Sequence, residues 1–96
     1  MKPSEIITRH RQTIRDIAAR FPVANVRIFG STARGQDKDG SDLDLLIDPL
    51  PHTTLFDLGG LQDELETRLG VRVDVCTPQD LPVSFRQQVL NEAQAL

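Results

Sequence analysis

The sequence predicts a small α/β domain, in which a mixed β-sheet is packed against helices. Apolar residues recur every three or four positions in residues 7–21 and 58–69, which is the period of a helix with one buried face. They recur at every second position in residues 43–47 and 71–75, which is the period of a strand. With a final helix near the C-terminus, the predicted order is α-β-(loop)-β-α-β-α.

The N-terminal third contains the first predicted helix and strand. One helical face holds Ile7, His10, Ile14, Ile17 and Phe21. We expect this helix to begin near Pro3 or Ser4, with Ser4 as its N-cap, and to end before Phe21-Pro22, because a residue before proline disfavours helical geometry. Residues 23–30 are rich in β-branched and aromatic side chains and end on a glycine, which predicts a strand entering a turn.

A polar connection leads to the second predicted strand. Residues 31–41 contain Gly35, Gly40 and mostly polar side chains, so they connect two elements. From residue 42 to residue 48 the side chains alternate between two faces. The apolar face holds Leu43, Leu45 and Ile47, and the opposite face holds Asp42, Asp44, Leu46 and Asp48.

The C-terminal half predicts a helix, a strand and a second helix. A leucine stripe over residues 58–69 ends at Gly70, a residue typical of helix C-termini. Residues 71–76 alternate, with valines on one face and Arg72, Asp74 and Cys76 on the other, and residues 81–96 predict the final helix. A strand-helix-strand connection favours a right-handed parallel crossover, whereas the first two strands permit an antiparallel or otherwise close pairing.

Composition and charge limit the functional classes. The 96 residues are expected to form one domain, residues 1–96. No apolar stretch approaches the roughly 20 residues of a membrane span, and the N-terminus lacks a secretory signal, so we expect a cytoplasmic location. The net charge of -3 argues against stable binding to nucleic acid. A single cysteine, Cys76, excludes an internal disulfide.

Paired carboxylates provide the first sign of catalysis. Asp42 and Asp44 stand two residues apart on a predicted strand, so both project from one face with Cα atoms about 6 to 7 Å apart. Such a pair repels unless a cation neutralises it, and oxygen ligands suit Mg²⁺. Asp74, on the polar face of the next strand, can complete a two-metal site. An Asp-x-Asp pair also occurs on solvated strand faces, so a second motif is needed.

Gly30 and Ser31 supply the second motif. A glycine allows the backbone to approach a polyphosphate closely, and the turn after it presents N–H groups and the Ser31 hydroxyl to phosphate oxygens. If Gly30 lies beside Asp42, a triphosphate is held between the turn and the metal ions. Most of the rate enhancement would then come from positioning and electrostatics.

These residues resemble a known family. The run Gly30-Ser31-Thr32-Ala33-Arg34-Gly35, followed by Ser41-Asp42-Leu43-Asp44-Leu45 and by Asp74, resembles the nucleotidyltransferases of the DNA polymerase beta superfamily, in particular its minimal nucleotidyltransferase branch. The resemblance implies a fold like the polymerase beta palm. It implies that Asp42, Asp44 and Asp74 are catalytic metal ligands, and that the nucleotide is bound by Gly30, Ser31, Arg34 and Ser41. For Arg34 the alternative is an ion pair with Asp37, Asp39 or Asp48.

The resemblance also implies an activity and a partner. Members of the minimal branch look like antitoxins encoded beside a helical toxin of the HEPN type, to which they attach AMP. We therefore expect Mg²⁺-dependent transfer of AMP from ATP, with two Mg²⁺ ions, to a partner protein. Since 96 residues leave no room for a separate acceptor-binding domain, we expect the acceptor surface to come from a partner or a second copy. The alternatives are a non-catalytic, nucleotide-binding antitoxin that masks a partner surface, and nucleotide transfer to RNA or a small molecule.

Overall fold

A four-stranded mixed sheet forms the centre of the molecule. The computed structural model describes all 96 residues, Met1–Leu96. The elements are α1 (Pro3–Ala18), β1 (Val23–Phe29), β2 (Leu43–Pro49), α2 (Leu55–Leu69), β3 (Val73–Cys76), the 3-10 turn η1 (Pro78–Asp80), α3 (Val83–Glu92) and β4 (Gln94–Ala95). The strand order is β3-β2-β1-β4, with β1 antiparallel to β2 and β4, and β2 parallel to β3. The predicted α/β class and the parallel crossover through α2 are confirmed.

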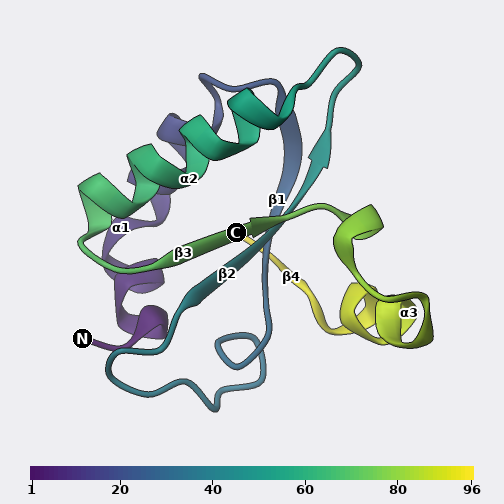
Figure 1. Cartoon of the computed structure of the whole chain (residues 1–96). Helices are drawn as coiled ribbons and strands as arrows, with labels where there is room; N and C mark the ends of the chain where they lie inside the picture. Colours follow the sequence, from purple (N-terminus) through teal and green to yellow (C-terminus); the bar gives the residue numbers. More distant parts are fainter.

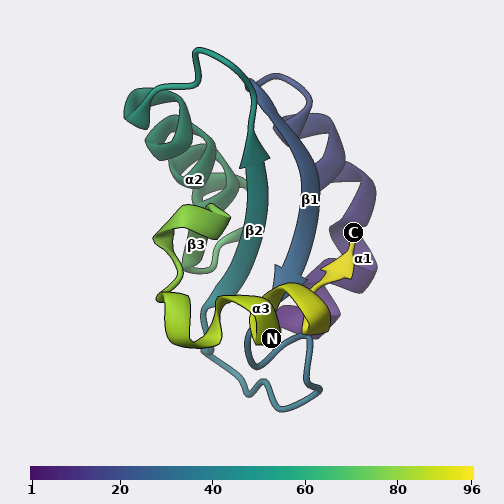
Figure 2. The same cartoon turned by 90° about the vertical axis from the view of Figure 1, so that its right-hand side faces the viewer.

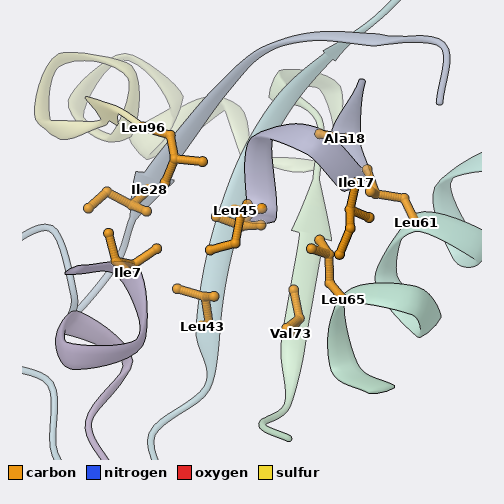
Figure 3. Close-up of a cluster of buried hydrophobic side chains, with 11 residues drawn as sticks. Ile7, Ile17, Ala18, Ile28, Leu43, Leu45, Leu61, Leu65, Val73 and Leu96 are labelled. Atoms are coloured by element: carbon orange, nitrogen blue, oxygen red, sulfur yellow. The ribbon is translucent and has the colours of Figure 1, made fainter. Parts of the chain in front are cut away.

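The helices lie on opposite faces of the sheet. Helices α1 and α2 together cover one face, whereas α3 lies on the other (Figures 1 and 2). The side chains between the sheet and the α1–α2 layer form a buried apolar cluster that includes Ile17, Leu43, Leu45 and Leu65 (Figure 3). Because Leu43 and Leu45 point into this core, strand alternation turns Asp44 to the α3 face. None of the helices is both long and apolar enough to cross a membrane.

Asp37 anchors the long β1–β2 connection to the start of α1. The backbone N–H of Ser4 donates to Asp37 Oδ2 at 2.8 Å, and Asp37 is buried. Burial alone raises the pKa of Asp37, but the hydrogen bonds with Ser4 bring the pKa below its ordinary value. The prediction that Ser4 is the N-cap is wrong. The helix begins at Pro3, and a carboxylate from 33 residues along the chain satisfies a first-turn amide instead.

The first predicted helix face is not continuous. The backbone of His10 has non-helical angles, φ -123° and ψ 21°, and marks a kink in α1. His10 is exposed, whereas Ile6, Ile7, Ile14 and Ile17 are buried. The placement of His10 on the buried face is therefore wrong, since its backbone leaves helical geometry at the kink and its side chain is exposed.

Helix α2 begins at Leu55, earlier than the leucine stripe predicts. The N–H of Asp57 donates to Thr54 Oγ1 at 3.2 Å, and the N–H of Thr54 donates to Asp57 Oδ2 at 2.9 Å. This reciprocal pair of bonds satisfies the first-turn amides. The apolar side chains of this first turn, Leu55 and Phe56, are highly exposed and lie outside the core.

The predicted last strand and helix are shorter than expected. Strand β3 begins at Val73 rather than residue 71. Residues 81–96 do not form one helix: α3 ends at Glu92, and the chain then pairs with β1 as β4. The two-residue strand β4 is held by tertiary pairing to Arg27 and Ile28, which no local sequence pattern indicates.

Candidate active site

The register of the sheet brings Asp44 and Asp74 next to each other. Asp44 pairs with Asp74 in the parallel ladder and with Phe29 in the antiparallel ladder. Paired residues of neighbouring strands lie about 5 Å apart and face the same side, so the two carboxylates are neighbours on the α3 face. Asp42 directly precedes β2, two positions before Asp44, and therefore lies at the same end of the sheet.

Gly30 lies so close to Asp44 that a side chain at position 30 would push the Asp44 carboxylate out of its place. A Cβ atom built on Gly30 would lie 2.5 Å from Asp44 Oδ2, and the φ angle of Gly30 is +72°, in the left-handed region. Both features require glycine. The turn backbone is therefore packed directly against the Asp44 carboxylate, which brings the Gly30 turn and the Asp-x-Asp pair together.

The turn after Gly30 presents unused backbone donors. Three backbone hydrogen bonds of 2.8 to 3.2 Å fold residues 30–36 into a helical turn. The N–H groups of Ser31, Thr32 and Ala33 donate to no protein acceptor. Free consecutive amides of this kind form anion-binding sites. The Thr32 hydroxyl is buried in the same turn without a hydrogen-bond partner, a feature that sequence reasoning missed.

Negative charge accumulates around Asp44. Burial, then the charges of Asp74 and Asp42, raise the pKa of Asp44 to about 6, and Arg34 opposes this rise. Burial and the nearby carboxylates, Asp74 foremost, also raise the pKa of the Cys76 thiol to about 11. Cys76 therefore stays protonated at neutral pH and is a poor nucleophile. The site attracts a cation.

Arg34 lies between the carboxylates and α3. Its guanidinium is 3.7 Å from Glu92 Oε2. The expected alternatives, an ion pair with Asp37, Asp39 or Asp48, are wrong. Asp37 binds the start of α1, Asp39 lies 3.4 Å from the N-terminal amine, and Asp48 lies 2.7 Å from Arg27.

Ser41 is engaged within its own loop. Its Oγ accepts a hydrogen bond from the N–H of Lys38 at 2.9 Å. The bond leaves the Ser41 hydroxyl proton available to a further acceptor. Ser41 stands directly before Asp42, so it belongs to the same end of the sheet as the carboxylates.

The chemistry of these side chains fits a hard divalent cation. Carboxylate oxygens are the ligands that Mg²⁺ prefers. Burial, and then the like charges of Asp74 and Asp42, raise the pKa of Asp44, and a bound cation would relieve that repulsion. No three acidic, histidine or cysteine side chains are close enough together to enclose one ion in the structure. Asp42 instead lies 3.7 Å from the Arg72 guanidinium, and Asp74 is exposed.

A pocket of about 280 Å³ adjoins the turn on the α3 side. It is lined by Phe29, Gly30, Arg34, Phe85, Gln88, Val89 and Glu92. The sequence analysis assigned no function to the α3 residues of this pocket. Their spacing of three and four could have indicated a shared surface, because residues 85, 88, 89 and 92 lie on one helical face.

A turn with free amides beside paired carboxylates on a small mixed sheet defines a nucleotide-dependent transferase site. Residues 10–96 match the family model of the nucleotidyltransferase domain, and the chain belongs to this family of nucleotidyltransferases. It is 36% identical over 87 residues to the protein adenylyltransferase MntA of Thermococcus cleftensis, an alignment that covers 91% of this chain and 85% of that protein. A candidate protein adenylyltransferase of Methanocaldococcus jannaschii is 37% identical, with 91% and 94% covered.

Solved structures agree with this family. A candidate minimal nucleotidyltransferase is 41% identical and superposes with a TM-score of 0.85, covering 97% of this chain and 95% of that one. A toxin–antitoxin complex with AMP-PNP is 19% identical and has a TM-score of 0.74, covering 88% and 69% of the two chains. The second likeness concerns the fold alone.

Proposed function

We propose that this protein transfers AMP from ATP to a hydroxyl side chain of a partner protein. The observation that carries the proposal is the pairing of Asp44 with Asp74 directly against the Gly30 turn. Relatives covering most of the chain support the choice of reaction, because MntA of Thermococcus cleftensis is named a protein adenylyltransferase.

Each site residue has a role in this proposal. The free amides after Gly30, with Ser31, Arg34 and Ser41, bind the phosphates. Asp42, Asp44 and Asp74 would hold two Mg²⁺ ions, which would supply positive charge to neutralise the phosphates and to lower the pKa of the attacking hydroxyl. Asp74 is the most exposed of the three carboxylates and orients the acceptor hydroxyl by accepting its hydrogen bond. The new bond joins the acceptor oxygen to the α-phosphorus, pyrophosphate leaves, and the hydroxyl proton passes to solvent.

The acceptor in this proposal is the toxin of a toxin–antitoxin pair. A solved complex of MntA with HepT has the same fold at a TM-score of 0.67 and 16% identity. That likeness supports only the fold, so the partner assignment rests on the MntA relative that is 36% identical. AMP on a side chain needed by the toxin would silence it covalently.

Labelling the α- or γ-phosphate of ATP tests the reaction. We would incubate the protein, Mg²⁺ and the product of the neighbouring gene with either labelled form. Transfer of AMP labels the partner from the α-phosphate only, whereas phosphorylation labels it from the γ-phosphate. Asp44→Asn should abolish labelling. Asp48→Asn is the matched control, since Asp48 lies on the same strand but is paired with Arg27 at 2.7 Å.

Two results would contradict the proposal. If Asp44→Asn still neutralises the partner and no label is transferred by the unmodified protein, the protein acts by masking a surface. If label appears on RNA or a small molecule and not on protein, the acceptor class is wrong.

A further inference from the structure

The pocket beside the Gly30 turn has a wall made by one face of α3. Phe85, Gln88 and Glu92 line it together with Gly30 and Arg34 of the turn. We propose that this pocket binds the base of the nucleotide, with the Phe85 ring stacked on the base and the Gln88 amide hydrogen-bonded to its edge. The inference rests on the proposed function, because it assigns the base subsite of the same nucleotide.

The chemistry of the lining suits a flat, uncharged heterocycle. Phe29, Phe85 and Val89 supply aromatic and apolar surface, and Gln88 supplies both a donor and an acceptor. The two charged residues of the pocket, Arg34 and Glu92, lie 3.7 Å apart and largely offset each other. A phosphate group would meet the Glu92 carboxylate, whereas a base gains stacking and edge hydrogen bonds.

The position of the pocket assigns it to the nucleotide rather than to the acceptor. In the strand order β3-β2-β1-β4, Asp74 lies on β3, and the pocket lies at the end of β1, where Gly30 follows Phe29. The acceptor approaches the exposed Asp74 on the β3 side. The pocket shares Gly30 and Arg34 with the phosphate-binding turn, so a molecule whose phosphates occupy the turn can place its base there.

Helix α3 has few contacts with the rest of the molecule, so a bound base would stabilise it. None of its ten residues is buried, and a helix of this length is marginal without tertiary support. Its attachments are the ion pair between Glu92 and Arg34 at 3.7 Å, the hydrogen bond from Arg86 Nη2 to the Leu81 carbonyl at 2.9 Å and, just beyond the helix, the hydrogen bond from Gln94 Nε2 to the Ala33 carbonyl at 3.2 Å. A base bound between Phe85 and the turn would add apolar contact to α3. We therefore expect the backbone amides of α3 to exchange hydrogen more slowly when ATP is bound.

Calorimetry with ATP and with inorganic tripolyphosphate, both with Mg²⁺, separates the base from the phosphates. Phe85→Ala should weaken ATP binding about tenfold, since one stacking contact is lost, and should leave tripolyphosphate binding within about twofold of wild type. Phe85→Leu, which keeps apolar volume but removes the ring, and Gln88→Ala should act in the same direction. Phe56→Ala is the matched control, because Phe56 is an exposed phenylalanine on α2, 91% accessible and outside the pocket. Hydrogen exchange of α3 should slow with ATP and not with tripolyphosphate.

The outcomes distinguish this inference from the proposed function. Undiminished ATP binding by folded Phe85→Ala and Phe85→Leu would overturn the base pocket and leave the AMP transfer intact. If these variants bind ATP normally but lose binding to the partner protein, the pocket binds a protein side chain, and the base pocket is again overturned. If the unmodified protein binds neither ATP nor tripolyphosphate, both the proposed function and the base pocket are wrong.

Discussion

Replacing Asp44 by asparagine should stabilise the metal-free protein at about pH 8 while abolishing AMP transfer. Burial and the charges of Asp74 and Asp42 raise the pKa of Asp44 from 3.8 to about 6. At 1.36 kcal/mol per pKa unit this shift corresponds to about 3 kcal/mol of destabilisation by the ionised carboxylate. Water reaches this half-buried group and screens its neighbours, so we expect a gain of about 1 to 2 kcal/mol in the free energy of unfolding.

The pH dependence follows from the direction of the shift. Because the pKa of the folded state lies above that of the unfolded state, ionisation of Asp44 removes stability as the pH rises from about 4 through about 6. Below about pH 4 the carboxyl is protonated in both states, and the gain from asparagine should vanish. Above about pH 7 the gain should be complete.

Urea unfolding in EDTA, followed by circular dichroism at low and high pH, measures this effect. Asp48→Asn is the control, since it removes a carboxylate from the same strand but breaks the 2.7 Å ion pair with Arg27, and it should destabilise the protein at about pH 8. An Asp44→Asn variant no more stable than wild type at about pH 8 would refute the electrostatic reasoning. An equal gain at both pH values would also refute it, because the effect would then not arise from ionisation.

Three further predictions follow from single contacts. Gly30→Ala should lower the free energy of unfolding by about 1 to 3 kcal/mol and weaken ATP binding. Gly35→Ala is the control: Gly35 also has a positive φ, +69°, but an added Cβ would have no atom within 4 Å, so the loss should be only about 1 kcal/mol. Equal losses of the two variants in thermal melts would contradict the contact between Gly30 and Asp44. Asp37→Ala should lose about 1 kcal/mol at neutral pH. Because the folded pKa of Asp37 is lowered, this loss should disappear in strong acid, and a pH-independent loss in urea titrations would exclude the capping role. Asp42→Asn should reduce the initial rate of AMP transfer about a hundredfold, and a near-normal rate would argue against a metal-ligand role.

The sequence predicted the structure best where the residues of the candidate site lie on a strand with regular alternation of apolar and polar side chains. The alternation over residues 42–48 predicted that Leu43 and Leu45 lie on one face and Asp42 and Asp44 on the other. The structure adds the register that pairs Asp44 with Asp74. The motif predicted a glycine at position 30 for close approach of the backbone to a polyphosphate, and the contact between Gly30 and Asp44 is a second reason that the sequence did not indicate.

Contacts between distant segments were not predictable in the same way. The bond from Asp37 to the first turn of α1 spans 33 residues, and the pairing of Arg34 with Glu92 depends on where α3 lies. Strand β4 has two residues, too few for any period to appear. In each case tertiary placement decides the partner, and local propensity carries no information about that placement.

Core packing and the candidate active site share one constraint, the register of β2. A slip of one residue would turn Asp44 into the apolar layer and bring Leu43 and Leu45 out of it, so burial of these leucines fixes the face on which Asp44 and Asp74 meet. The leucines therefore stabilise a position that electrostatic repulsion alone disfavours. Burial, together with the charges of Asp74 and Asp42, raises the pKa of Asp44 to about 6, yet the carboxylate persists there because the apolar core determines where it lies. The accumulated negative charge favours a divalent cation at this position.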